Sequence, residues 1–261
     1  MPDLRVLVCV KRVAVVGESL ELVDGEPRAD LVNWVLNQWD GVALAAALSL
    51  CDRAGTGEVV VVTVDDEAAD EMLRECLACG AHRAIRIPAV TAAGGDPLAV
   101  GRLLAAVAER EIFTIVLAGA QSEDMSNAAT GAAVAGYLDA PLVALVKSIE
   151  LDDEYADVER ELSGGRTEVL RVRTPAVLTV QTGSYTPKQP TLRQLKQARQ
   201  RPVEIFDLAA AGLSENDVRD CAGTRRLSLA QPEAGRRATM IDGDVAQVAS
   251  RIHELVRSRV G

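Results

Sequence analysis

The chain has 261 residues, of which 48% are hydrophobic, and its formal net charge is −10. This length allows one large α/β domain or a domain with an appendage, and the hydrophobic content excludes a disordered chain. A strongly acidic chain does not bind a phosphate backbone non-specifically, so we expect no nucleic-acid partner.

Strands and helices alternate through the first half of the chain. Apolar β-branched runs predict buried strands, and the segments between them are helical in pattern with short loops. Strands are expected at residues 4–10, 58–64, 84–87 and 113–119, and helices at 40–52, 67–79 and 97–110. Asp96 and Pro97 suit the N-cap and first position of the third helix. The alternation predicts an α/β fold: an open, mainly parallel Rossmann-like sheet with helices on both faces.

After about Leu142 the pattern changes to strands without helices. The strand-like runs are 142–151, 155–162, 167–174 and 176–182. Short polar or glycine-rich turns separate them, so we expect antiparallel hairpins that extend the sheet.

The C-terminal part is polar and irregular until a final amphipathic helix. Its apolar residues fall on one helical face: Val245, Val248, Ile252, Leu255 and Val256. We therefore divide the chain into a nucleotide-binding α/β domain, residues 1–207, and a C-terminal arm, residues 208–261. An arm this weakly apolar must lie on its own domain or on another subunit.

The cysteines and the chain's apolar runs bear on its location. The five cysteines are odd in number and scattered, which favours a reducing compartment. No apolar run approaches the roughly 20 residues that span a bilayer. The N-terminus enters an apolar strand at once, with no cleavage-site pattern after it. We expect a cytoplasmic protein without direct membrane insertion.

Familiar catalytic motifs do not occur. The chain contains no GxGxxG, no GxxxxGK[ST] and no GxSxG. Cys76 and Cys79 form a CxxC without a second ligand pair, so small core residues on a helix explain them better than a redox or zinc site. The glycines of SGGRTE (163–168) are best read as a turn between two strands.

Polar residues follow two of the expected central strands. CVKRV (9–13) ends the first strand, at the edge where open α/β folds bind ligands. LNQWDGVAL (36–44) enters the next helix, where Asp40 is most simply an N-cap and Trp39 a packing residue.

GAQSEDMSNAATG (119–131) links a buried strand to a helix of small residues. Asn127, Ala128, Ala129 and Thr130 are expected in its first turn. Free N–H groups and a hydroxyl there would seat an anion, although a capped helix without a ligand remains the alternative. Glu123 and Asp124 would repel a phosphate, so they should face solvent, ribose hydroxyls or a partner.

Taken together, these segments resemble the β subunit of electron transfer flavoprotein. The resemblance covers residues 4 to about 204 and is carried by LRVLVCVKRV, LNQWDGVALAAAL, LRECLACGAHRAIRI, LAGAQSEDMSNAATG, VERELSGGRTEVLRVRTPAVLTV and PTLRQLKQARQRPVE, in that order. It implies the adenine nucleotide alpha-hydrolase-like variant of the fold. Departures such as Gln38, Gly41 and Val16 mark a divergent branch that serves a specialised dehydrogenase.

The resemblance implies an electron carrier without substrate chemistry of its own. Its partners would be an α subunit that holds most of an FAD, a flavin-dependent dehydrogenase as donor, and a quinone reductase or other acceptor. The β subunit would bind a structural AMP, or a second FAD if the complex bifurcates electrons. The arm from about Leu208 would bury its apolar positions largely against the α subunit.

The resemblance also implies site residues. The residues matching the AMP pocket are Val10, Lys11, Asn37, Gln121, Thr130 and Gly131. Trp39 stands beside the flavin, and Val64 and Asn127 complete the cofactor-binding set. Leu192 matches the leucine that docks the dehydrogenase, with Arg193 and Lys196 beside it.

Two other classes of protein remain open. An ATP-using enzyme of the related nucleotide-hydrolase-like superfamily is disfavoured by the missing phosphate loop. A universal-stress-type nucleotide-binding module would need neither the hairpins nor the C-terminal arm. A yellow 1:1 complex with an α subunit would distinguish the carrier from both.

Overall fold

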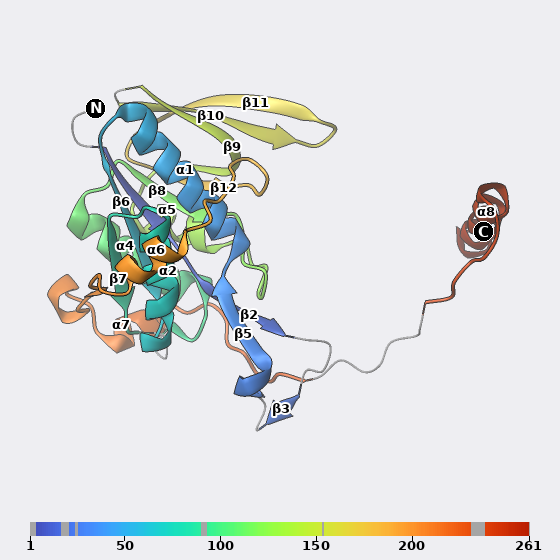
Figure 1. Ribbon diagram of the computed structural model, residues 1–261, viewed down its shortest axis with the longest axis horizontal. Coiled ribbons are helices and arrows are strands. Elements are labelled where there is room, and N and C mark those ends of the chain that lie inside the picture. The colour runs from blue at the N-terminus through green and yellow to red at the C-terminus, as the bar shows by residue number, and fades with distance from the viewer. Residues whose placement is uncertain are drawn as a thin grey trace.

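The computed structural model describes residues 4–16, 21–23, 26–89, 93–152, 154–230 and 238–260. Its centre is a nine-stranded sheet of order β11-β10-β9-β12-β8-β1-β6-β7-β13. The sheet and its helices are drawn in Figure 1. The sheet strands are β1 (Arg5–Cys9), β6 (Glu58–Val64), β7 (Arg83–Ile87), β8 (Ile115–Gly119), β9 (Leu142–Asp152), β10 (Tyr155–Leu162), β11 (Arg166–Arg173), β12 (Ala176–Val180) and β13 (Glu204–Ile205).

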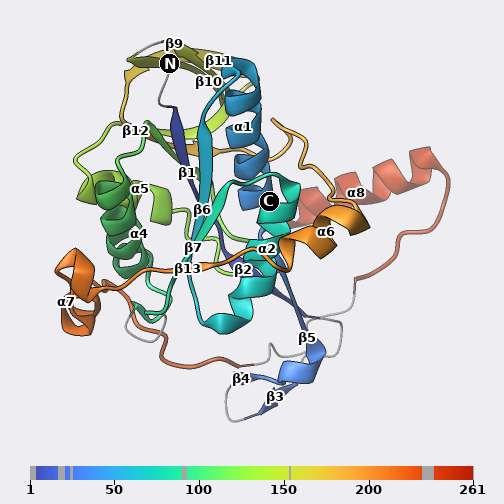
Figure 2. The same cartoon turned by 60° about the vertical axis from the view of Figure 1, so that its left-hand side comes forward.

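Helices lie on both faces of this sheet, as the alternating pattern predicts (Figure 2). The helices are α1 (Gln38–Ala54), α2 (Asp70–Cys79), α4 (Pro97–Glu111), α5 (Thr130–Tyr137), α6 (Leu192–Ala198), α7 (Glu215–Asp220) and α8 (Val245–Val260), with 3-10 turns η1 (Ala29–Leu31), η2 (Glu67–Ala69) and η3 (Ala209–Ala211). Asp96 caps α4 as expected, because its carboxylate accepts hydrogen bonds from the N–H groups of Leu98 and Ala99.

Two apolar layers sandwich the sheet. Val6 and Val8 of β1 join the core formed with α1 and α2, whereas Leu7 and Cys9 join the core formed with α4. Successive residues of a strand point to opposite faces, so a strand covered on both sides is apolar throughout. This is why the runs for β1, β6 and β8 are recognisable in the sequence.

The central strands are parallel, and the extension is only partly antiparallel. β6 and β8 pair in parallel with β1, and β7 with β6. β9, β10 and β11 form the expected antiparallel hairpins. The fourth expected run, β12, differs because it lies in parallel between β8 and β9. All five of its residues are buried, which suits a central strand and not a half-exposed hairpin strand.

The segment between the first strand and the first helix contains structure that the pattern did not predict. Strands β2 (Arg12–Val16) and β5 (Val32–Leu36) pair as an antiparallel ribbon, and β3 (Leu22–Val23) pairs with β4 (Glu26–Pro27). The ribbon projects from the sheet (Figure 1). Arg12 stacks on Trp34 across it, with the guanidinium 4.5 Å from the ring centroid.

The C-terminal arm has two parts. Val218 of α7 is fully buried in the core around α4, and Asp96 accepts hydrogen bonds from the N–H and hydroxyl of Thr224 at 2.8 and 2.6 Å. This first part therefore packs on the chain's own domain, unlike the expectation that the arm from Leu208 lies on another subunit. α8 stands apart from the domain (Figure 1), and Ile252 and Val256 on its apolar face are exposed.

Candidate functional site

The strand order reverses between β1 and β8. From β1 the chain runs outward through β6 and β7, and then returns to the other side of β1 as β8. Parallel strands end at the same edge, and ligands of open α/β folds bind where the order reverses. The three polar segments that the sequence singles out, around Lys11, Asn37 and Gln121, meet at this place.

Asn37 connects all three segments. Its side-chain Nδ2 donates to the carbonyl of Gln121 at 3.0 Å, and its Oδ1 accepts the N–H of Glu123 at 3.2 Å. Its own N–H donates to the carbonyl of Lys11 at 2.9 Å. Because Asn37 is only 1% exposed, these bonds are shielded from water and hold the loop after β8 against the end of β1.

Asp40 has a different role from the expected N-cap. α1 begins at Gln38 with Asn37 in the N-cap position, and no side chain caps it. The Asp40 carboxylate instead accepts the N–H of Lys11 at 2.8 Å on one oxygen and the N–H of Gly119 at 3.0 Å on the other. It thereby ties the carboxyl ends of β1 and β8 together.

The Asp40 carboxyl is strongly perturbed. Burial raises its pKa to about 7, although hydrogen bonds from Asn37, Lys11 and Gly119 favour the ionised form. Sequence reasoning missed this role because both partners are backbone groups of distant strands. The sequence did contain one signal for a buried role: Asp40 is followed directly by an almost wholly apolar stretch of α1.

Gly119 is required by the same contacts. A Cβ at this position would lie 2.4 Å from Asp40 Oδ1 and 2.6 Å from Trp39 Cβ. The strand end therefore packs directly on the start of α1. Trp39 is half-buried there, as a packing residue would be, and it lies next to the candidate nucleotide segments.

α5 begins later than the sequence suggests. Its first residue is Thr130 and its N-cap is Ala129, with no side-chain cap. Asn127 therefore lies in the loop, exposed, between Ser126 and Ala128, which have left-handed φ values of 51° and 50°. The expected first turn around Asn127 is wrong, and the uncapped N–H groups belong to the turn that starts at Thr130.

Gly131 fixes the position of this helix start. A Cβ on Gly131 would lie 2.4 Å from Cγ2 of Thr179 in β12. The first turn of α5 thus packs against the sheet at the end of β12, close to the point where β8 gives way to the loop. Thr130 and Gly131 are brought to the same edge as Lys11 and Gln121.

Asp124 faces Lys11 and does not point to open solvent. Both of its carboxylate oxygens lie 2.7 Å from Lys11 Nζ. Burial acts to raise the pKa of Asp124, but hydrogen bonds from Lys11 and Ser122 and the Lys11 charge lower it overall. The side chain of Glu123 is exposed, as expected for one of the alternatives given above.

Val10 and Val64 lie at the same edge in different surroundings. Val10 is buried directly after β1, and its N–H donates to the carbonyl of Val62. Val64 ends β6, on the side of β1 away from β8. Beside it, Arg12 forms an ion pair with Asp65 at 3.0 Å. Val64 therefore lies on the β6 side of Lys11, whereas Gln121 follows β8 on the other side of β1.

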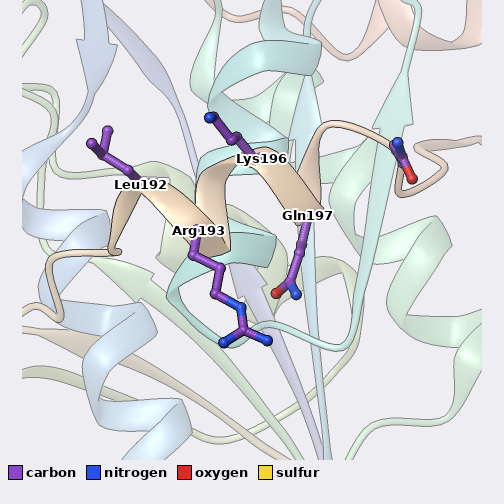
Figure 3. Close-up of a pocket in the computed structure, with 5 residues that line it drawn as sticks. Leu192, Arg193, Lys196 and Gln197 are labelled. Atoms are coloured by element: carbon purple, nitrogen blue, oxygen red, sulfur yellow. The ribbon is translucent and has the colours of Figure 1, made fainter.

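The proposed docking residues lie on α6, a short capped helix. Thr191 and Gln194 form a capping box: Gln194 N–H donates to the Thr191 hydroxyl at 3.3 Å, and Thr191 N–H donates to Gln194 Oε1 at 2.8 Å. Leu192 is 78% exposed in the first turn. A shallow depression of about 440 Å³ is lined by Leu192, Arg193, Lys196, Gln197 and Gln200 (Figure 3).

The basic cluster around α6 consists of Lys188, Arg193, Lys196, Arg199 and Arg201, and only part of it is available to a partner. Lys188 Nζ lies 3.3 Å from Asp52, and Arg201 donates to the carbonyls of Ala81 and His82. Within the described part of the chain, Arg193 and Lys196 form no ion pair and are exposed. The two basic side chains without an ion-pair partner therefore lie beside Leu192 on one surface of α6.

Comparisons with known proteins all indicate the same family. The chain is 39% identical to electron transfer flavoprotein subunit beta of Methylophilus methylotrophus, over 99% of this chain and 100% of the relative. It is 32% identical to the subunit beta of Bos taurus, with 82% and 85% covered. The family model for the electron transfer flavoprotein domain matches residues 29–211. The chain belongs to the electron transfer flavoprotein β-subunit family.

Family membership gives the chain a role in flavin-dependent electron transfer and implies an α-subunit partner. A further relative, 34% identical over 81% of each chain, is a subunit of a caffeyl-CoA reductase–Etf complex in Acetobacterium woodii.

Among the described residues no group of three or more His, Cys, Asp or Glu side chains is arranged to hold a metal ion. Cys76 is buried on α2 within the core, as a small core residue would be. In the same described ranges, none of the helices has both the length and the apolar character needed to traverse a lipid bilayer.

Proposed function

We propose that this β subunit pairs with an α subunit that holds most of an FAD, accepts electrons from a flavin-dependent dehydrogenase and passes them to a quinone reductase or other acceptor. The chain itself would make and break no substrate bonds. Its contribution is to bind, orient and shield the flavin and to dock the donor, because the redox chemistry belongs to the cofactor.

The observation that carries this proposal is the bonded junction of Lys11, Asn37, Asp40 and Gly119 at the strand reversal, beside the uncapped start of α5. N–H groups at a helix start favour a bound phosphate, and the residues that match the family's AMP pocket come together there. We propose that AMP binds here, through Thr130, Gly131 and Gln121 among others. Asn127, being in the loop, would contribute from outside the helix.

The donor set fits such a ligand. The first turn of α5 offers N–H groups that no side chain caps, and Gly131 packs that turn closely against Thr179 of β12. Trp39 and Val64 supply apolar surface at the same edge, and we propose that Trp39 lies beside the flavin. A single phosphate suits the start of α5 better than a chain of phosphates, because the helix dipole is equivalent to only about half a positive charge and balances little negative charge.

The test is to purify the heterodimer, denature it and identify the released nucleotides. We expect a yellow 1:1 complex that releases FAD and AMP. Release of FAD alone, with two per heterodimer, would replace AMP by the second flavin expected of a bifurcating complex. A colourless homodimer that binds or hydrolyses ATP would overturn the proposal in favour of an ATP-using enzyme or a universal-stress-type module.

The proposal for dehydrogenase docking rests on α6. Leu192 is a large exposed apolar side chain with free cations beside it, which suits a small transient interface. Buried anchors of this kind contribute about 2 kcal/mol or more, so Leu192→Ala should slow electron transfer from the cognate dehydrogenase by about tenfold or more. Flavin content and absorbance should stay unchanged.

Matched variants separate anchoring from charge. Val169→Ala, on the edge strand β11, truncates another exposed apolar residue (67% exposed) and should leave the rate unchanged. Neutralising Lys196 and Arg199 should lower the association rate and flatten its salt dependence. If Leu192→Ala and Val169→Ala transfer electrons equally fast, α6 is not the docking surface.

A further inference from the structure

An ion pair closes the junction between β1 and the loop that leads to α5. Lys11 is the second residue after β1, and its Nζ contacts both oxygens of Asp124 at 2.7 Å, across 113 residues of sequence. The Lys11 side chain is 45% exposed and the Asp124 side chain 24% exposed. The pair therefore lies at the rim of the proposed nucleotide site, within reach of solvent and of a bound anion.

The loop that carries Asp124 is held on both sides of it. Asn37 binds the carbonyl of Gln121 and the N–H of Glu123, and the N–H of Ser126 donates to the carbonyl of Ser122 at 2.9 Å. These bonds fix the backbone around Asp124. The contact with Lys11 is thus part of the folded junction and not a chance approach of two mobile side chains.

The other cations at this edge are also paired. Arg12 lies 3.0 Å from Asp65, and Arg86 lies 2.8 Å from Asp70. Among the described residues at the ends of β1, β6 and β7, each of these basic side chains therefore already contacts a carboxylate. A nucleotide bound at the described part of this edge would meet the start of α5, which is equivalent to about half a positive charge, and basic side chains that each already contact a carboxylate.

We propose that Asp124 determines which nucleotide this site accepts, because it neutralises Lys11 and so restricts the site to a single phosphate. This inference rests on the nucleotide site proposed above and defines its specificity. Each additional phosphate adds negative charge, which an unpaired lysine would attract and which the carboxylate of Asp124 repels. The penalty from Asp124 therefore grows with the number of phosphates and is absent for a neutral nucleoside.

The experiment uses the purified heterodimer and compares wild type with Asp124→Asn. Adenosine, AMP, ADP and ATP compete in turn against labelled AMP, and their dissociation constants are determined. In Asp124→Asn we expect the affinity for ADP to increase about tenfold relative to that for adenosine, and the affinity for ATP to increase more. The affinity for adenosine itself should not change. The added affinity should fall with increasing salt, because it comes from charge.

Two control variants identify the source of the effect. Glu123→Gln removes the neighbouring acidic charge, which lies on an exposed side chain, and should leave the order of affinities as in wild type. Lys11→Gln added to Asp124→Asn should abolish the gain for ADP and ATP. The second control tests whether freed Lys11 is the group that attracts the extra phosphates.

The results that would overturn the inference are distinct. An equal change for all four ligands, adenosine included, would mean that Asp124 only shapes the loop. If the variant still binds AMP and the ratios of the four dissociation constants are the same as in wild type, the role of Asp124 is refuted and the nucleotide site stands. A wild-type heterodimer that binds none of the ligands would refute both the site and its specificity.

Discussion

At the scale of single residues, the junction depends on side chains that bond to backbone. Asp40 accepts N–H groups from two strand ends, and Asn37 binds the loop after β8 on both its donor and its acceptor atoms. Gly119 leaves room for these contacts, since any side chain there would meet Asp40 and Trp39. Such buried polar contacts fix a single arrangement, because an unpaired partner would be costly.

The perturbed carboxyl of Asp40 predicts a pH dependence of stability. With a folded-state pKa of about 7, the native protein retains a proton that the unfolded chain, with its ordinary value of about 3.9, has already lost. Native protein thus binds more protons in the window between these values, and the free energy of unfolding falls as pH rises through it. Above about pH 7 both states are ionised and the contribution is constant.

Asp40→Asn should remove this part of the pH dependence. Urea unfolding midpoints measured from pH 5 to pH 8 should fall less steeply for this variant than for wild type. Asp220→Asn changes an exposed aspartate at the end of α7 and should keep the wild-type slope. Equal slopes for wild type and Asp40→Asn would show that Asp40 is ionised throughout this range.

At the scale of elements, α6 shows how a short helix can present a side chain. The helix spans Leu192–Ala198, too short to be stable alone, and its capping box satisfies N–H groups at its start. Leu195 and Ala198 attach it to the core over α2. Leu192, in the first turn, is therefore held outward at a defined position.

Loss of the cap should loosen the helix. Thr191→Ala removes the hydroxyl that accepts the Gln194 N–H and should cost about 0.5–2 kcal/mol of local stability. Hydrogen exchange of the α6 amides should accelerate, and electron transfer should slow less than in Leu192→Ala. Thr191→Ser retains a hydroxyl and should resemble wild type; if it exchanges as fast as Thr191→Ala, the capping bond does not stabilise α6.

Strands with a regular apolar pattern could be predicted, whether they are buried on both faces or on one, because that pattern is visible in the sequence. The run 58–64 matches β6 and the run 155–162 matches β10, residue for residue. The ribbon strand β5 is partly exposed along its length and gave no such signal. Asp40 was wrongly interpreted as an N-cap, and the contact of Asp124 with Lys11 was not foreseen. In both cases the partners are remote in sequence, and only the strand order brings them together.

At the scale of the whole molecule, the C-terminal arm divides into an attached and a separate part. Residues 209–224 pack on the domain through Val218 and the bonds between Asp96 and Thr224. α8 carries an exposed apolar face away from that domain. A face of this kind on a single helix is covered by another surface in the assembled protein, and we propose that the surface belongs to the α subunit.

Truncation should therefore affect assembly more than folding. A chain ending at Ile241 should form the heterodimer more weakly, while the melting temperature of the isolated β subunit changes little. Asp96→Ala in the full-length chain should lower the melting temperature of the isolated β subunit more than it weakens the heterodimer, because it removes both the α4 cap and the contact with Thr224. Normal assembly of the truncated chain would show that α8 does not contact the α subunit.

If α8 contacts the α subunit as proposed, the attachment at Thr224 also affects how it binds. Once the two domains of a heterodimer are in contact, α8 is tethered near its target, and its effective local concentration is of order millimolar. The contact made by α8 can then be weak by itself and still be occupied most of the time. After each dissociation α8 rebinds before the two subunits separate. An isolated α8 peptide has no tether, so it would need comparably high concentrations to displace the helix.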